Sequence, residues 1–296
     1  MEYIPAKHLL FRSRTSEWFG TDHTMNIYRG CCHGCFYCDS RSDCYQIKEF
    51  DRVRAKADAL RILRDDLARK VKPAFISMGA MSDPYNPFEG ELRLTRHALE
   101  LIDAYDCGVA IATKSDLIVR DIDLLTSVQN HSPVICKITV TTAVDALAAK
   151  VEPNAPPPST RFGALKELSG AGLFAGVLLM PVLPFLEDSD EGVLAVVEGA
   201  AQAGAQFIYP AFGVTMRQGQ REYFLDSLEQ AFPSQGLKER YIRRYGTSYQ
   251  CVSPRARTLW KVFAEACRAR GILYDMKSII RAATLGYGDR QLTFFD

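Results

Sequence analysis

The most informative segment of the chain is Asn26-Ile27-Tyr28-Arg29-Gly30-Cys31-Cys32-His33-Gly34-Cys35-Phe36-Tyr37-Cys38. Cys31, Cys35 and Cys38 have the spacing C-x3-C-x2-C and follow a short apolar run, so we expect them on a loop at the carboxyl end of a strand. Three thiolates on one tight loop can hold three irons of a cubane cluster and leave the fourth iron without a protein ligand. Gly30 and Gly34 relieve crowding where the backbone wraps such a cluster.

Two other interpretations of the cysteine loop remain open. A structural zinc site needs four ligands, usually two separated pairs. Cys32, Cys44 or His33 could be the fourth, but no second pair follows. The loop could also carry unliganded cysteines, although five of the nine cysteines fall within residues 31–44, a density that favours metal. We expect the four scattered cysteines to be small buried hydrophobes, namely Cys107, Cys136, Cys251 and Cys267.

Outward from the loop, β-branched apolar runs alternate with amphipathic stretches. The predicted strands are Met25–Arg29, Ala74–Met78, Val109–Thr113, Val134–Thr141, Ala175–Val182 and Gln206–Ala211. The predicted helices are Arg52–Lys70, Leu94–Tyr105, Ser115–Val128, Ser159–Gly170 and Ser189–Ala203. Such alternation indicates an α/β fold with a parallel sheet and helices outside it. Six repeats are too few for a closed eight-stranded barrel, which leaves an open, partial barrel or a doubly wound sheet.

The pattern changes after Ala211. The segments beyond it predict helices and no strand, at Arg221–Phe232, Gly236–Tyr245, Pro254–Arg270 and Tyr274–Thr284. We therefore expect a barrel over residues 16–212 and a helical C-terminal extension over 213–296, packed on the barrel. The extension has 14 Lys and Arg against 8 Asp and Glu, whereas residues 1–212 have 22 against 27. A basic extension on an acidic body suggests an anionic partner, although a solvated helix surface explains it almost as well.

The composition is that of a globular protein. Of the 296 residues, 47% are hydrophobic and 24% are charged. No apolar run approaches the roughly 18–20 residues that span a bilayer. The first residues also lack the basic and apolar regions of a secretory signal. We therefore expect a cytoplasmic protein without a membrane partner.

The cysteine loop, with Tyr37 just before the last cysteine, resembles the signature of the radical S-adenosylmethionine (SAM) enzymes. The string NIYRGCCHGCFYCDSRS is similar to the spore photoproduct lyase family and its photolyase-like relatives. The similarity continues through SMGAMSDPYNPFE (77–89), ATKSDLIVRDIDLL (112–125), KITVTT (137–142), LLMPVLPFLED (178–188) and GVTMRQGQREYF (213–224).

The resemblance implies a partial (βα)6 barrel, a [4Fe–4S] cluster and SAM. In the family an electron enters the cluster from a donor such as flavodoxin or ferredoxin. SAM, bound to the open iron, is then cleaved to a 5′-deoxyadenosyl radical that takes hydrogen from the substrate. The protein's part is binding, orientation and exclusion of water.

Carried over residue by residue, the resemblance makes Cys31, Cys35 and Cys38 the cluster ligands and places Tyr37 near the adenine. Ser77 and Gly79 belong to the segment that meets the methionyl amino group. Lys114 and Thr139 match the lysine and the hydroxyl that hold the SAM carboxylate, a task that suits a cation and a donor.

The sequence leaves the roles of several polar residues open. Asp83 either binds substrate or caps a turn, and Arg161 either contacts SAM or starts a helix. Glu187 and Asp188 follow Pro184, where a barrel loop reaches the active face, but we expect them rather to cap the helix that begins at Ser189. The spore enzyme returns a hydrogen atom from a dedicated cysteine, and no cysteine here lies in an equivalent motif. The two candidates for that role are Cys107 and Cys136.

The function that follows is a radical SAM enzyme acting on nucleic acid, as a DNA-repair lyase or a base-modifying enzyme. We expect phosphate contacts from Arg217, Arg221, Arg240, Arg243 and Arg244. The alternative is an enzyme that modifies a peptide or a small molecule, and a zinc-bound nucleic-acid-binding module is a third option. The final residues Gln291–Phe295 resemble the peptide that docks repair proteins on the sliding clamp; otherwise they pack back onto the barrel.

Overall fold

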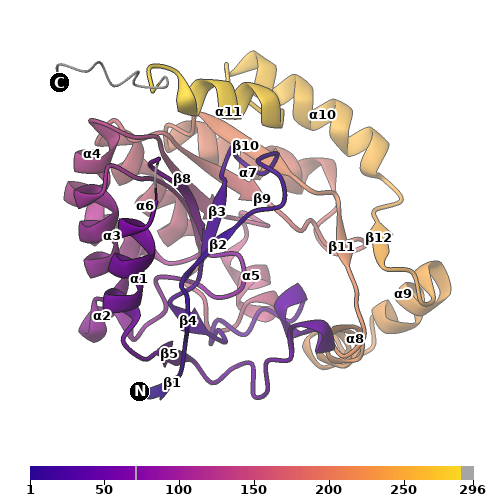
Figure 1. Ribbon diagram of the computed structural model, residues 1–296. Helices are drawn as coiled ribbons and strands as arrows, with labels where there is room; N and C mark the ends of the chain where they lie inside the picture. Colours follow the sequence, from indigo (N-terminus) through magenta and orange to yellow (C-terminus); the bar gives the residue numbers. More distant parts are fainter. Residues whose placement is uncertain (71, 288–296) are drawn as a thin grey trace.

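Parallel strands form the central sheet of the protein. The computed structural model describes residues 1–70 and 72–287 (Figure 1). The seven-stranded sheet has the order β10-β9-β8-β7-β6-β3-β2, with neighbours parallel from β3 to β10 and β2 antiparallel at the edge. Its strands are β2 (Leu10–Arg12), β3 (His23–Met25), β6 (Phe75–Met78), β7 (Gly108–Thr113), β8 (Val134–Thr139), β9 (Ala175–Leu179) and β10 (Phe207–Pro210). Six parallel strands confirm the partial barrel.

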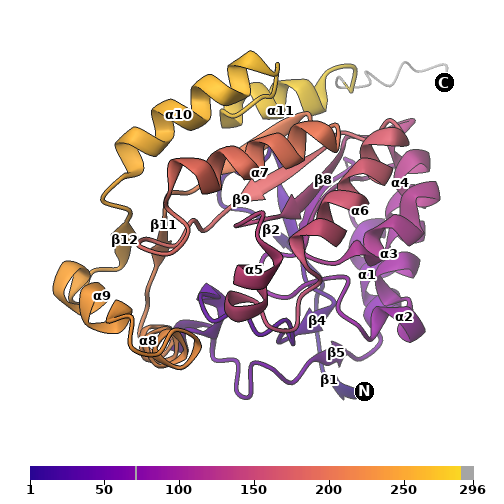
Figure 2. The same cartoon turned by 180° about the vertical axis from the view of Figure 1, so that it is seen from behind.

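Helices cover the outer face of this sheet (Figures 1 and 2). They are α1 (Ala59–Ala68), α2 (Glu89–Leu92), α3 (Leu94–Ala104), α4 (Ile122–Gln129), α6 (Pro158–Gly170) and α7 (Asp190–Gln202). Helix α5 (Asp145–Val151) instead packs at the carboxyl end of the barrel, in one apolar cluster with Phe36 of the cysteine loop. Short 3-10 turns occur at Asp39–Arg41 (η1), Asp43–Tyr45 (η2) and Asp116–Asp121 (η3). Strands β6, β8 and β9 are buried along their whole length, because helices cover one face and barrel side chains fill the other. No helix within the described residues is long and apolar enough to span a membrane.

Two sequence predictions near the N-terminus were wrong in detail. The first predicted strand divides into β3 and β4 (Tyr28–Arg29), and β4 joins a separate sheet of order β1-β5-β4. That sheet also contains β1 (Glu2–Ile4) and β5 (Arg54–Lys56), the latter within a predicted helix. Gly30 has a φ of +82°, and a Cβ there would lie 2.6 Å from the Phe50 carbonyl oxygen. Pairing of β5 with both β4 and β1 therefore overrides the local apolar pattern. The left-handed backbone of Gly30 then turns the chain from β4 into the cysteine loop.

From Gly213 to Tyr287, the described part of the extension contains four helices and two short strands. These are β11 (Gly213–Thr215), α8 (Gln220–Ala231), α9 (Leu237–Tyr245), β12 (Gln250–Val252), α10 (Ala256–Ala269) and α11 (Met276–Thr284). The prediction of no strand was wrong, because β11 and β12 pair antiparallel with each other. The boundary at Phe212 itself stays a prediction. The expected clamp-binding peptide, Gln291–Phe295, lies outside the described residues.

The extension closes two openings of the barrel. Side chains of α8 and α9 pack against Phe36 and Tyr37 of the cysteine loop in one apolar cluster. Helix α11 covers the amino ends of the strands, where its residues Ile279 and Ala283 join Phe19 inside the barrel. The extension therefore shields the cysteine loop on one side and seals the opposite end of the barrel (Figure 2).

The barrel interior holds an unusual cation, Lys137. It lies on β8 between two residues that face inward. Ile135 belongs to the apolar cluster of Phe19 and Ile279 inside the barrel, and Thr139 lies near the cysteine loop. The side chain is 1% exposed, and its Nζ lies 4.6 Å from the centroid of the Phe19 ring. It forms no ion pair with any residue in 1–70 or 72–287. Burial lowers the pKa of Lys137 to about 7, because no carboxylate compensates the charge.

Candidate functional site

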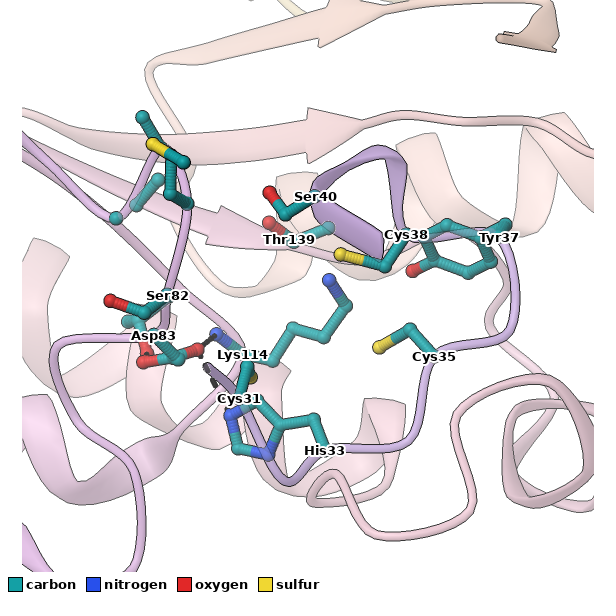
Figure 3. A pocket seen from close by; sticks show the side chains of 15 residues that line it. Cys31, His33, Cys35, Tyr37, Cys38, Ser40, Ser82, Asp83, Lys114 and Thr139 are labelled. Atoms are coloured by element: carbon teal, nitrogen blue, oxygen red, sulfur yellow. Dashed lines mark hydrogen bonds and ion pairs between the residues drawn. The ribbon is translucent and has the colours of Figure 1, made fainter. Parts of the chain in front are cut away.

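A cavity lies between the cysteine loop and the carboxyl ends of β6, β7 and β8 (Figure 3). Parallel strands all end at this edge, so loops from distant parts of the sequence meet there. The loop after β4 contributes Cys31, Cys35 and Cys38, and strands β7 and β8 contribute Lys114 and Thr139. The structure therefore brings together the residues expected to bind the cluster and most of those expected to contact SAM.

The three cysteines of the loop face one space. Their backbone is fixed by hydrogen bonds from Cys31 N to the Phe50 carbonyl oxygen (2.9 Å) and from Cys38 N to the Cys35 carbonyl oxygen (3.2 Å). Burial raises the pKa of the Cys31 thiol to about 12 and raises that of Cys35 as well. Thiolates at such positions need nearby positive charge, which the irons of a cluster supply. The donor set therefore fits an iron–sulfur cluster.

The arrangement gives no support to a zinc site. Among the residues that the structure describes, no three or more His, Cys, Asp or Glu side chains are placed to hold a single metal ion. Cubane ligands need not converge in that way, because each thiolate binds a different iron. Cys32 and Cys44 do not line the cavity, and Cys44 is exposed with its Sγ 3.8 Å from Nη1 of Arg217.

Asp83 binds the loop after β6 to the end of β7. Its carboxylate accepts hydrogen bonds from Thr113 Oγ1 (2.6 Å), Lys114 N (2.8 Å) and Tyr85 N (2.9 Å). Nε2 of His33 lies 3.0 Å from it. Burial alone would raise the pKa of Asp83, but His33 and these donors lower it to about 2. Asp83 therefore caps a turn, one of the two roles considered from the sequence, and it also lines the cavity, while a role in substrate binding stays a prediction.

Gly79 brings the backbone of β6 close to its neighbour. Its φ is +91°, and a Cβ at this position would lie 2.0 Å from the carbonyl oxygen of Ala112. No side chain fits there without moving the strand, so glycine keeps this wall of the cavity open. Ser77 is buried one step deeper in β6 and does not line the cavity, whereas Ser40 and Ser82, which sequence analysis missed, do.

Lys114 extends from the end of β7 into the cavity, between the Cys35 and Cys38 thiols in Figure 3. Its Nζ lies 3.9 Å from Oε1 of Glu152 and 5.5 Å from the centroid of the Tyr37 ring. Burial would lower the pKa of Lys114, but Cys35 and Glu152 raise it, so the amine stays charged. A charged amine at this place can bind an anionic group.

Glu152 and Arg161 form a buried ion pair behind Lys114. Sequence analysis left Arg161 with two alternative roles, a contact to SAM or the start of a helix, and it did not identify Glu152. Neither is more than 1% exposed. Glu152 lies just before a proline-rich connector, and nothing in that local pattern signals a functional carboxylate.

Four residues considered from the sequence lie away from the cavity or have other partners. Cys107 precedes β7, and Cys136 lies within β8 in the core that contacts the helices, so neither thiol lines the cavity. The helix cap at α7 is Ser189, whose side chain accepts from Gly192 N, and the expected caps Glu187 and Asp188 were wrong. Glu187 accepts from Thr141 Oγ1 (2.9 Å), while Asp188 accepts from Ser253 Oγ (2.5 Å) of the extension.

Comparison with known proteins places this site in context. Residues 25–197 match the family described as the Radical SAM superfamily. An uncharacterized protein of Mycobacterium tuberculosis is 30% identical over 231 residues, covering 76% of this chain and 68% of the relative. One of Methanocaldococcus jannaschii is 29% identical over 214 residues, covering 72% of this chain and 78% of the relative.

Solved structures show the same fold. A mutant of spore photoproduct lyase has a TM-score of 0.66 at 16% identity, covering 92% of this chain and 80% of that one. Spore photoproduct lyase complexed with dinucleoside spore photoproduct has a TM-score of 0.64 at 16% identity, covering 92% and 81%. TsrM, a radical SAM methyltransferase from Kitasatospora setae with a tryptophan substrate, has a TM-score of 0.56 at 11% identity, covering 89% and 58%.

Proposed function

Because this chain belongs to the radical SAM superfamily, whose members use a [4Fe–4S] cluster and SAM, we propose that both cofactors bind in the cavity beside the cysteine loop. Cys31, Cys35 and Cys38 would hold three irons. When bound, the cofactors supply a 5′-deoxyadenosyl radical that takes hydrogen from a substrate. The protein binds and orients both partners and excludes water. An electron donor such as flavodoxin or ferredoxin stays a prediction.

The walls of the cavity suit the methionine part of SAM. Lys114 supplies a buried cation for the carboxylate, and Thr139 at the end of β8 supplies a hydroxyl on the same wall. Gly79 lines the cavity at the end of β6, where backbone carbonyl groups would accept hydrogen bonds from the ammonium group. Tyr37 packs its ring beside Lys114 at the end of the cysteine loop.

Replacing Lys114 by alanine should weaken SAM binding by roughly ten- to hundredfold and leave the iron content unchanged. A hydrogen bond to a charged group contributes about 1.5–3 kcal/mol, which corresponds to that change in affinity. Equilibrium binding of SAM to anaerobically reconstituted protein measures the effect. Unchanged affinity in the variant would remove Lys114 from the site.

We propose nucleic acid as the substrate, with a DNA-repair lyase or base-modifying activity. The observation that carries this proposal is the row of exposed cations on α9. Arg240, Arg243 and Arg244 are exposed and form no ion pair with a described residue. The guanidinium of Arg240 lies 4.0 Å from the centroid of the Phe185 ring, in the loop after β9. Stacked aromatic and arginine side chains are typical of surfaces that bind exposed bases and phosphates.

The other two expected arginines are already engaged. Arg221 donates to the carbonyl oxygens of Gly246 (2.7 Å) and Met216 (3.2 Å), so it stabilises the extension. Nε of Arg217 lies 3.2 Å from Asp39, and Nη2 donates to Tyr249 Oη at 3.0 Å. Arg217 can still contact phosphate at its exposed edge, whereas Arg221 is withdrawn from the proposed surface.

Phosphate contacts by α9 predict a particular salt dependence. Replacing Arg243 and Arg244 by glutamine should weaken DNA binding at low salt and lower the slope of log K against log [salt] by about two, since each phosphate contact contributes about 0.9. The matched control replaces two exposed cations of α10, Arg257 and Lys261, and should keep the wild-type slope. Equal slopes in the two double variants, or no DNA binding at low salt, would contradict the proposal.

A turnover assay tests the substrate class directly. Reconstituted protein is incubated anaerobically with reductant, SAM and either irradiated DNA, untreated DNA or no DNA, and 5′-deoxyadenosine and altered bases are measured. We expect irradiated DNA to increase turnover and to lose its lesion if the enzyme is a lyase. Stimulation by untreated DNA would indicate base modification. Cleavage of SAM that neither DNA affects would favour a peptide or small-molecule substrate.

A further inference from the structure

The Glu152 carboxylate contacts side chains from three separate segments of the chain. It follows α5 directly, and its side chain is fully buried. Tyr37 of the cysteine loop donates its hydroxyl to Oε1, and Arg161 of α6 pairs with Oε2. Nζ of Lys114, at the end of β7, lies 3.9 Å from Oε1. A single carboxylate therefore connects the cysteine loop, a helix and a strand end.

Arg161 links this group of side chains to a fourth segment, the end of β8. Its Nη1 donates to the carbonyl oxygen of Thr139 on β8 (3.0 Å), and its Nε donates to that of Pro156 (2.7 Å). Tyr37, Lys114 and Thr139, three of the residues expected to contact SAM, thus each touch Glu152 or its ion-pair partner. No other described carboxylate is paired with Lys114.

The three charged side chains of this group sum to one positive charge. Lys114 and Arg161 are cations, and Glu152 is the one anion paired with both. Burial would raise the pKa of Glu152, but Lys114 and Arg161 lower it, so the carboxylate stays ionised. Buried charges are costly unless they are paired, and a ligand carboxylate beside Lys114 would complete the balance.

We propose that Glu152 is a positioning residue, which holds Lys114 and the Tyr37 ring in the orientation that binds SAM. The proposal rests on the proposed placement of SAM in this cavity. A lysine side chain has many rotamers, and an ion pair with a fixed carboxylate restricts them before the ligand arrives. Glu152 acts through Lys114 and Tyr37 and need not touch SAM.

The test combines Glu152→Gln with Lys114→Met in a double-mutant cycle on reconstituted protein. Glu152→Gln keeps an acceptor for Tyr37 but removes the charge that holds Lys114. SAM affinity and the electron paramagnetic resonance spectrum of the reduced cluster, with and without SAM, are measured together with iron content. We expect about tenfold weaker SAM binding and an altered SAM-dependent spectrum, with normal iron content. In the Lys114→Met background, Glu152→Gln should add little.

Glu187→Gln is the matched control. Glu187 is also a buried glutamate near the cavity, but its partners are Thr141 and Leu183 N, and it contacts neither Lys114 nor Tyr37. Burial raises the pKa of Glu187 to about 8, so glutamine resembles its protonated form. This variant should bind SAM like the wild type.

Three outcomes would count against the proposal. If Glu152→Gln binds SAM like the wild type or more tightly, Glu152 does not position Lys114. If it weakens SAM equally in both backgrounds, its effect does not pass through Lys114 and it is a structural brace. If Glu152→Gln does not fold, Glu152→Asp keeps the charge but shortens the side chain that reaches Lys114, and unchanged SAM affinity and spectrum in that variant would overturn the proposal. Failure of the wild type to bind SAM would instead refute the proposed cofactor site.

Discussion

Replacing Cys38 by alanine is expected to leave the protein without an intact [4Fe–4S] cluster and to reduce SAM cleavage to background. Each thiolate of the loop is proposed to bind a different iron, so the loss of one cannot be compensated by the other two. Cys38 and Cys35 follow one another closely in a loop closed by the hydrogen bond from Cys38 N to the Cys35 carbonyl oxygen. Iron and sulfide content, cluster absorbance and production of 5′-deoxyadenosine measure the effect.

Cys32→Ala and Cys44→Ala are the matched controls for this prediction. Both thiols are close to the loop in sequence, but neither lines the cavity, so the cluster should form normally. The assignment fails if Cys32→Ala loses iron while Cys31→Ala keeps it. It also fails if zinc binds stoichiometrically and iron does not.

Replacing Lys137 by methionine is expected to stabilise the fold by a few kcal/mol at and below pH 7. Methionine keeps most of the apolar stem in the barrel and removes an amine that has no described carboxylate partner. Burying an unpaired ammonium group costs several kcal/mol, and the variant avoids that cost. Chemical denaturation of wild type and variant measures the difference.

The same substitution should change the pH dependence of stability. Folding lowers the pKa of Lys137 from 10.5 to about 7, so between these values the unfolded chain binds more protons at this group than the folded one. The wild type should therefore gain stability from this lysine as pH rises from about 7 towards 10.5. The stabilising effect of the substitution is largest below pH 7 and disappears at high pH. An exposed lysine, Lys166→Met, should show no such pH-dependent difference.

A variant that is less stable than the wild type at every pH would contradict this prediction. It would mean that the amine contributes a stabilising contact in the folded protein, rather than an unpaired charge. Comparing the two proteins across the pH range separates this group from the many carboxylates that titrate at lower pH.

Much of the fold could be predicted from the sequence, because local apolar periodicity distinguishes its strands from its helices. Alternating apolar runs and amphipathic helices predicted six parallel strands, and the described residues form six, from β3 to β10. The errors arose where local patterns compete with distant pairing. The Arg54–Lys56 segment looked helical but forms β5 between β1 and β4, and Gly213–Thr215 becomes a strand only because Gln250–Val252 pairs with it.

The cysteine loop and its expected chemistry were determined by the sequence alone. Three thiols within eight residues converge as soon as the chain makes one tight loop, and the wider strings around them resembled one family, which the comparisons support. The family resemblance marked Gly79 only as part of the segment that meets the methionyl amino group, and the structure adds that a Cβ there would lie against the Ala112 carbonyl group.

The residues from distant parts of the chain that surround this loop could be identified only from the folded structure. Tyr37 and Glu152 are 115 residues apart in sequence, and no periodicity connects them. It likewise placed Cys107 and Cys136 away from the cavity, although both lie in or beside barrel strands. The physical reason is that a strand's register and direction decide whether a side chain faces the barrel interior, the helices or the cavity edge. Register depends on pairing with other strands. The thiol spacing is local and can be read from the sequence, whereas the ion pairs around Glu152 form only when the strands are assembled into the barrel.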